Sequence, residues 1–204
     1  MGEITEEIIK HGLPVVFIDT QDEYANLVDK LGGSILTPGD DFTIRISSLT
    51  DRELIDAVPT DSDLQKNIIA AAFLELQDEI KARTRTMFTL EDLLSRIEIV
   101  GPNLTNSIAS VNLAYRRTKF LERTEGFGTG IKRANWPKYM HPCLSIRCKH
   151  LSSSKLQMVA TALLREFQDL RLREYIPPYV MVIDEAHLFV PQGESTPCKQ
   201  IIRE

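Results

Sequence analysis

Two short apolar runs, each of which ends in acidic residues, constrain the fold of this chain more than any other feature. Leu13–Asp19 is apolar as far as its final acid, and Tyr179–Ile183 is followed directly by Asp184 and Glu185. Continuous apolar runs of this length are typical of strands buried on both faces, as in a parallel sheet. A third segment, Cys143–His150, also has strand character. We therefore predict an α/β fold built on a mostly parallel sheet.

Helical patterns surround these segments. A long helix is predicted to begin at Ser152–Ser154, because apolar residues recur three and four positions apart as far as Leu170. The chain opens on a pattern typical of the last turns of a helix, which Gly12 ends as a cap. Ile35–Leu36 and Phe42–Ile46 are predicted to be short strands on either side of a turn.

The middle of the chain is mainly helical in character. Asp61 or Ser62 is suited to cap a helix, and Thr89–Asp92 has the pattern of a capping box. We interpret this block as a helical bundle inserted into the sheet domain. The prediction divides the chain into residues 1–50 (first part of the core), 51–140 (helical insertion) and 141–204 (second part of the core, with the acidic strand).

Composition excludes some classes of protein. The 204 residues are 43% hydrophobic and 26% charged, with a net charge of −5 and a pI of about 5.5. This acidity gives no bulk electrostatic support for nucleic-acid binding, although a ring-shaped translocase can confine positive charge to its channel. The longest apolar runs fall far short of the roughly 20 residues that span a bilayer. Three cysteines and no recognisable signal peptide predict free thiols and a cytoplasmic location.

Val180–His187 carries the strongest chemical signal, since two acids emerge where an apolar strand ends. Hydrolysis of a phosphoanhydride needs Mg²⁺ to neutralise charge and a base to orient the attacking water. Asp184 is predicted to hold Mg²⁺ through a coordinated water, and Glu185 to polarise the attacking water. The alternative is a buried strand that ends in two solvated acids.

A second signal is the strand Val15–Asp19, which Glu23 and Tyr24 follow closely. Ligands bind at the carboxyl edge of open α/β sheets, so Asp19 is predicted to point towards a nucleotide site. Two alternatives remain open for Glu23 and Tyr24. They either face the nucleotide or a neighbouring subunit, or they are a loop acid and a packed aromatic ring.

The order of these motifs resembles that of the HerA-like ATPases, which are close in fold to FtsK-type DNA pumps and conjugation ATPases. In that family a strand ending in Asp precedes a Glu-Tyr pair and an inserted helical bundle. A strand, a long helix ending near Leu-Arg, and Ile-Asp-Glu-Ala-His with a nearby Val-Pro then follow. The matching residues here are Asp19, Glu23-Tyr24, Leu163–Arg165, Asp184–His187 and Phe189–Pro191, in the same order.

The resemblance implies a RecA-like P-loop NTPase that uses ATP and Mg²⁺. By this resemblance Asp19 and Glu23 contact the nucleotide, Asp184 serves the metal and Glu185 is catalytic. It also implies a DNA translocase or helicase involved in DNA processing or repair. Its expected partners are DNA, further copies in a homo-hexamer, and a nuclease or repair protein, with no membrane.

Two features depart from the family pattern. The 204 residues contain no G-x-x-x-x-G-K-[ST] loop and no Gly-Lys pair, so the usual phosphate cradle is missing. The strand that would follow the last residues, with its polar sensor, is missing as well. We therefore expect a fold truncated at both ends that is inactive alone. The alternatives are a fragment of a superfamily-two Asp-Glu-Ala-His helicase and a non-catalytic remnant that acts as an interaction module.

Three further patterns are interpreted as structural. His141, Cys143, Cys148 and His150 straddle a predicted strand rather than a turn, which argues against a zinc site. Cys148 alternates in phase with Leu144 and Ile146, which predicts a core position for it. Gly126–Gly130 has no lysine in the position that binds phosphate and is interpreted as a mobile loop. A basic stretch near Trp136 is interpreted as a solvated helix end, with a DNA-facing or subunit-facing surface as the alternative. Its members are Arg116, Arg117, Lys119, Arg123, Lys132 and Arg133.

Overall fold

The computed structural model describes residues 2–123 and 134–189, and for residues 153 and 154 it describes the backbone. Its contacts divide the chain into two compact units. The sheet unit consists of Met1–Ile44 and Lys132–Glu204, and the helical unit consists of Arg45–Ile131. No helix within the described residues is both long and apolar enough to cross a membrane.

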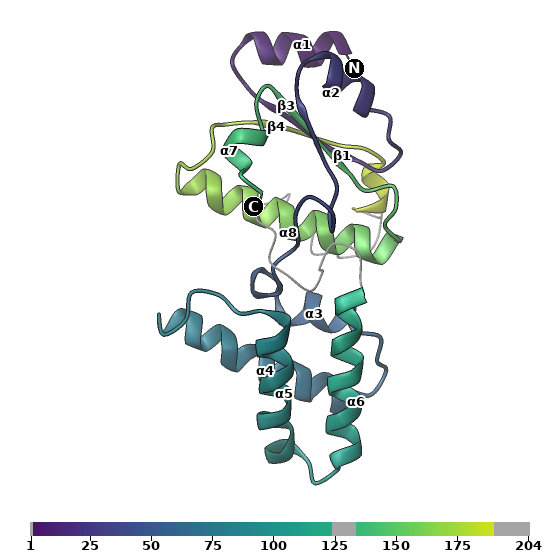
Figure 1. Ribbon diagram of the computed structural model, residues 1–204, viewed down its shortest axis with the longest axis vertical. Helices are drawn as coiled ribbons and strands as arrows, with labels where there is room; N and C mark the ends of the chain where they lie inside the picture. The colour runs from purple at the N-terminus through teal and green to yellow at the C-terminus, as the bar shows by residue number, and fades with distance from the viewer. Residues whose placement is uncertain (1, 124–133, 190–204) are drawn as a thin grey trace. The chain divides into compact units, whose positions relative to one another are not determined.

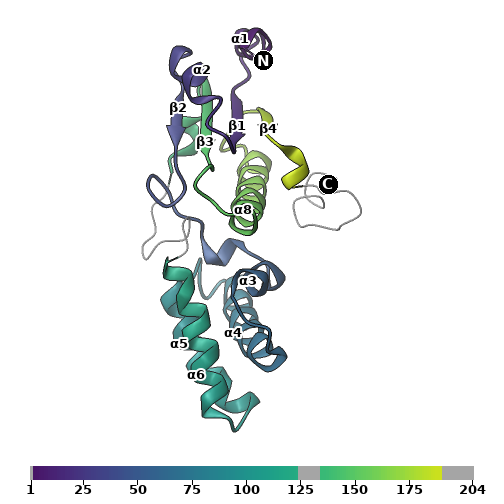
Figure 2. The ribbon, with the colours of Figure 1, turned by 90° about the vertical axis from the view of Figure 1, so that its right-hand side faces the viewer.

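The sheet unit is built around four strands that all run in the same direction. They are β1 (Val15–Asp19), β2 (Ser34–Leu36), β3 (Cys143–Arg147) and β4 (Val180–Ile183). Their order is β2-β3-β1-β4, and Figure 2 shows them side by side in this order. This arrangement confirms the predicted α/β fold with a parallel sheet.

The position of each strand in the sheet determines its burial. All five residues of β1 are buried, because β1 pairs with β3 on one side and with β4 on the other. The residues of β4 are only half-buried, since no described strand pairs with its outer edge. The prediction of a strand buried on both faces therefore holds for β1 and is wrong for β4.

Helices cover both faces of the sheet (Figure 1). α1 (Gly2–Lys10) and α2 (Ala25–Lys30) lie on one face, and α8 (Ser153–Leu172) lies on the other. Alternate residues of β1 point to opposite faces, so Val15 and Phe17 pack with Val28 and Cys143 beneath α1 and α2. Each large apolar side chain buried in this way stabilises the fold by about 1.5–3 kcal/mol.

An aromatic cluster holds α8 and the short helix α7 (Trp136–Tyr139) within the sheet unit. The ring of Phe167 lies edge-on to Trp136 at 4.8 Å and to Tyr179 at 5.9 Å. Trp136 also meets Phe42 at 5.1 Å and donates its indole N–H to Glu166 over 3.1 Å. Trp136 is thus a core residue rather than part of an exposed basic surface.

The helix ends in the sheet unit agree with the sequence pattern. α1 ends at Lys10, and Gly12 follows in a left-handed conformation with φ of 79°, which confirms it as the cap. α8 begins after Ser152 and runs to Leu172, as its apolar stripe predicts. Phe42–Ile46, in contrast, is not a strand, and its only ladder contact is an isolated bridge between Pro38 and Phe42.

The reason for that error is the alternation of burial along the segment. Phe42, Ile44 and Ile46 are buried, and the residues between them are partly exposed. An extended segment that buries one side produces the same period of two as a paired strand. The apolar pattern therefore reports burial here and does not report hydrogen-bonded pairing.

The helical unit contains four α-helices in the described residues: α3 (Asp51–Ala57), α4 (Asp63–Lys81), α5 (Leu90–Leu104) and α6 (Ile108–Lys119). Short 3-10 turns, η1 (Ile46–Ser48) and η2 (Phe120–Arg123), lie at its two ends. Ser62 caps α4 and the Thr89–Asp92 capping box opens α5, as the sequence predicts. A second capping box, formed by Thr50 and Glu53, opens α3.

Close approach of α5 and α6 depends on one glycine. A Cβ atom added to Gly101 would lie 2.6 and 2.7 Å from the two methyl carbons of Val111. Real carbon atoms do not approach so closely, so the contact requires a residue without a side chain. Pro102 follows inside the same helix.

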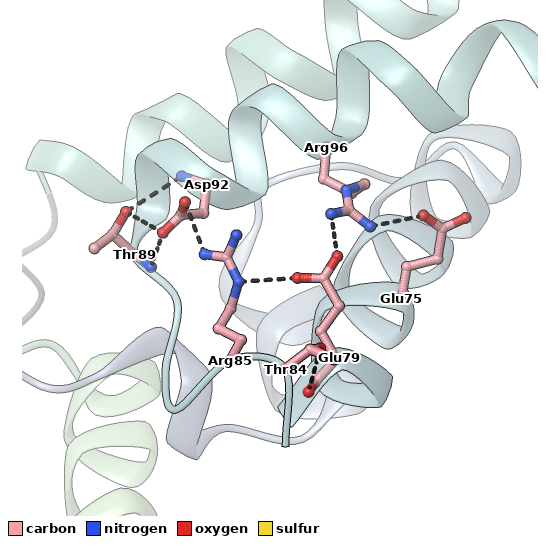
Figure 3. Close-up of polar contacts among 7 residues, drawn as sticks. All are labelled: Glu75, Glu79, Thr84, Arg85, Thr89, Asp92 and Arg96. Atoms are coloured by element: carbon pink, nitrogen blue, oxygen red, sulfur yellow. Dashed lines mark hydrogen bonds and ion pairs between the residues drawn. The ribbon is translucent and has the colours of Figure 1, made fainter. Parts of the chain in front are cut away.

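A network of ion pairs fastens the end of α4 to the start of α5 (Figure 3). Arg85 pairs with Glu79 and Asp92, each over 2.9 Å. Arg96 bridges Glu75 over 3.0 Å and also contacts Glu79. Asp92 is the capping-box acid of α5, so the network connects a helix cap to the neighbouring helix.

Candidate functional site

The candidate site lies at the carboxyl edge of the sheet, where β1 and β4 end beside each other. The backbone N–H of Asp184 donates to the carbonyl of Ile18 over 3.1 Å, which continues the ladder by one residue. The hydroxyl of Thr20 donates to Oδ2 of Asp184 over 2.9 Å. The structure therefore brings the acid that follows β4 against the loop that follows β1.

Asp19 is completely buried, and its carboxylate organises that loop. Oδ1 accepts the backbone N–H groups of Gln21 and Glu23 over 3.2 and 3.1 Å. Oδ2 accepts the backbone N–H of Tyr24 over 3.0 Å and the hydroxyl of Ser145 over 3.4 Å. Four donors satisfy a charge that would otherwise be costly to bury. Both oxygens of Asp19 are thus committed to protein groups, and its structural role is to hold the loop.

Arg147 secures the same loop from the end of β3. Its Nε and a terminal nitrogen donate to the two oxygens of Asp22 over 2.8 and 2.7 Å. Asp22 has a left-handed φ of 66°, so this pair holds a sharp bend in the loop. The hydrogen bond from Arg147 lowers the pKa of Asp22 below its ordinary value, and the same bond raises the pKa of the guanidinium. Sequence reasoning missed this pair, because 125 residues separate its members.

Tyr24 is packed, whereas Glu23 is exposed. The ring of Tyr24 stacks on Phe17 with 4.5 Å between centroids and 18° between planes. Burial raises the pKa of the Tyr24 hydroxyl, and the negative charges of Asp184, Glu23 and Asp19 raise it further. Of the two alternatives for Tyr24, the structure shows the packed ring. The side chain of Glu23 is exposed beside it.

Asp184 and Glu185 differ in surroundings although they are neighbours. Asp184 is half-buried and tied to Thr20, and Glu185 is exposed with φ of 50° and ψ of 48°. A left-handed conformation costs a residue with a side chain roughly 1–2 kcal/mol. Three hydrogen bonds hold the turn that follows: Leu188 N–H donates to Glu185 O over 2.8 Å, Phe189 N–H donates to Ala186 O over 3.1 Å, and Gln157 from α8 donates to Leu188 O over 2.7 Å.

His187 lies next to Glu185 in space. Its Nδ1 is 3.1 Å from Oε2 of Glu185, and both side chains are substantially exposed. Solvent screens an exposed pair of this kind, so it contributes little to stability. The contact nevertheless limits the directions in which the Glu185 carboxylate points, and neither His187 nor Gln157 was singled out as a site residue from the sequence.

The oxygen donors at this edge suit magnesium better than a softer metal. Mg²⁺ is usually bound through one or two carboxylates, several waters and the phosphates of a substrate, rather than in a cage of protein ligands. Asp184 presents one half-buried carboxylate, and no cluster of three or more His, Cys, Asp or Glu residues suited to a metal occurs in the described parts of the chain. The residues present therefore fit Mg²⁺ held together with a nucleotide.

Cys148, which is predicted to be a core residue, is buried, and Cys143 is buried as well. Burial raises the pKa of Cys143 to about 11 and that of Cys148 to about 12, so both thiols stay protonated near neutral pH. A protonated thiol is a poor metal ligand. His150 lies 3.3 Å from the carbonyl of Pro38, and His141 is exposed.

Several predicted features fall outside the described residues. They are Gly126–Gly130, the basic residues Lys132 and Arg133, and Val190-Pro191. Arg116, Arg117 and Lys119 lie in the last turn of α6, where the helix dipole favours cations.

A parallel sheet with helices on both faces, and with acids at the carboxyl ends of two adjacent strands, is a doubly wound α/β fold of the kind that P-loop NTPases have. Residues 1–167 match the family model described as "Helicase HerA, central domain", and the chain belongs to this family. The matched range includes Asp19 and Glu23 and ends within α8, before β4.

A solved structure supports the fold independently. The chain is similar to VirB4 of Thermoanaerobacter pseudethanolicus, with a TM-score of 0.68 and 14% sequence identity. The likeness covers 99% of this chain and 60% of the VirB4 chain, so the protein spans about three fifths of that neighbour's length. No curated protein sequence matches the chain.

Proposed function

We propose that this chain forms part of the ATP-binding and ATP-hydrolysing core of a HerA-like DNA translocase or helicase that acts in DNA processing or repair. The observation that carries the proposal is the meeting of Asp184 with the Asp19 loop at one edge of the sheet. Family membership and the VirB4 likeness support the nucleotide-binding class. We propose further that the working protein is a homo-hexamer that acts on DNA with a nuclease or repair partner.

In this proposal the acids have separate tasks. Asp184 would hold Mg²⁺ through a coordinated water, and Mg²⁺ would supply the positive charge that neutralises the phosphates. Glu185 would orient and polarise the attacking water and take up its proton as the water oxygen bonds to the terminal phosphorus. The bond from that phosphorus to the bridging oxygen breaks, and ADP and inorganic phosphate leave. Asp19 acts through the loop it holds, and that loop presents Glu23 at the edge of the nucleotide site.

The phosphate cradle is the part that these residues do not supply. The 204 residues contain no Gly-Lys pair, so we propose that the chain alone hydrolyses no ATP at a measurable rate. The cradle then comes from another segment or another chain. A form of the protein that also carries a phosphate-binding loop is therefore the material for activity measurements.

The test separates ATP binding from hydrolysis in such a form. Glu185→Gln should leave binding of a fluorescent ATP analogue nearly unchanged and reduce turnover by at least about 100-fold, because Glu185 acts on water. Asp184→Asn should also weaken the Mg²⁺-dependent part of binding. Turnover by Glu185→Gln at the unsubstituted rate would refute the assignment and leave a non-catalytic interaction module as the better description.

A further inference from the structure

Thr20 occupies a position that no motif singled out. It is the first residue after β1, and its side chain is only 6% exposed. β1 and β4 run in parallel with Ile18 opposite Ile183, so Thr20 and Asp184 leave the sheet at the same edge. Its hydroxyl lies 2.9 Å from Oδ2 of Asp184.

The chemistry of this contact fixes its direction. An ionised carboxylate has only acceptor sites, so the Thr20 hydroxyl is the donor. The oxygen that accepts from Thr20 is Oδ2 of the Asp184 carboxylate. A β-branched residue has few χ1 rotamers, and burial restricts them further. Thr20 is therefore a rigid donor that selects one orientation of the Asp184 carboxylate.

Orientation matters because of what Mg²⁺ requires. Magnesium demands near-ideal octahedral geometry, so a carboxylate that rotates freely pays an ordering cost each time the ion binds. Groups that hydrogen-bond to a metal-bound carboxylate typically contribute about 10–100-fold to metal affinity or activity. If Asp184 holds Mg²⁺, Thr20 is a group of this kind, because its hydroxyl donates to the Asp184 carboxylate. The inference therefore rests on the proposed function.

We propose that Thr20 is a positioning residue that holds the Asp184 carboxylate in the orientation used for Mg²⁺-nucleotide. It touches neither nucleotide nor metal, and it acts through Oδ2 of Asp184. The loop that Asp19 and Arg147 hold is the platform that keeps Thr20 in place.

The first test uses the 204-residue chain and needs no turnover. Thr20→Val removes the hydroxyl and keeps the branched shape, and Thr20→Ser keeps the hydroxyl as the matched control. NMR three-bond Hα–Hβ couplings of Asp184 should show one rotamer in the unsubstituted chain and in Thr20→Ser, and averaged rotamers in Thr20→Val. A single unchanged rotamer in Thr20→Val would overturn the inference, provided that Trp136 fluorescence shows the variant to be folded.

The second test uses the form with a phosphate-binding loop and measures Mg²⁺ dependence. Thr20→Val should raise the Mg²⁺ concentration for half-maximal binding of a fluorescent ATP analogue by about tenfold or more, and Thr20→Ser by less than about threefold. Binding without Mg²⁺ should be equal in all three proteins. Equal Mg²⁺ dependence in the valine variant, or equal losses in both variants, would overturn the inference.

The two tests also distinguish this inference from the proposed function. If the rotamers average in Thr20→Val and the unsubstituted protein binds ATP with no Mg²⁺ dependence, the positioning by Thr20 stands and the role given to Asp184 fails. If Mg²⁺ dependence is present and Thr20→Val leaves it unchanged, the role of Asp184 stands and that of Thr20 fails.

Discussion

Replacing Asp19 by Asn tests whether one buried carboxylate holds the loop at the candidate site. Asn has nearly the same shape, but only one of its two terminal atoms accepts hydrogen bonds. If its oxygen keeps the N–H groups of Gln21 and Glu23, its amide nitrogen faces the N–H of Tyr24, donor against donor. The substitution therefore removes one acceptor from a fully buried site.

The expected cost follows from these contacts. A buried donor left without a partner costs about 1–3 kcal/mol, and each remaining bond loses about 1 kcal/mol when its acceptor is no longer charged. Relief from burying a charge offsets part of this loss. We expect Asp19→Asn to destabilise the sheet unit by roughly 2–4 kcal/mol.

Urea unfolding of the 204-residue chain measures this cost. Trp136 is the only tryptophan, is 4% exposed and belongs to the sheet unit, so its fluorescence reports on that unit. With a slope of about 2 kcal/mol per molar urea, the midpoint should fall by about 1–2 M at unchanged slope. Asp29→Asn, an exposed acid on α2, is the matched control. A midpoint for Asp19→Asn within about 0.3 M of this control would refute the reasoning.

Two further predictions concern other parts of the fold. Gly101→Ala should lower the thermal midpoint of the helical signal at a cost of about 1–3 kcal/mol, because the new methyl group overlaps Val111, and the double variant with Val111→Ala should recover most of the loss. The pKa of Asp22 in the folded protein lies below its ordinary value of 3.8, because Asp22 is paired with Arg147. The pair therefore adds its full share to the free energy of unfolding above pH 3.8, and this share is lost as the pH falls through the lowered pKa. Asp22→Asn should therefore flatten the fall of the Trp136 unfolding midpoint as the pH is lowered below 3.8, and an unchanged slope would contradict this role.

Local sequence determined the elements that depend on interactions between residues close together in the chain. The run Val15–Ile18 is apolar without alternation, and it forms the most buried strand of the sheet. Ser62 and Thr89 begin helices because their side chains accept the backbone N–H groups of the first turn, an interaction within three residues. The acids after the two strands were likewise visible, since strands of a parallel sheet end at the same edge.

Only the tertiary structure decided what those acids contact. The pattern of residues along the sequence does not determine the order of the strands. The order β2-β3-β1-β4 is what places Thr20 within hydrogen-bond distance of Asp184, and Arg147 within hydrogen-bond distance of Asp22. The same order leaves β4 half-buried although its residues are as apolar as those of β1. Hydrogen bonds between residues more than 100 positions apart leave no periodic signal in the chain. The sequence by itself therefore determined which side chains reach the carboxyl edge, and the packing of distant strands decided that Asp19 organises a loop while Asp184 is oriented by Thr20.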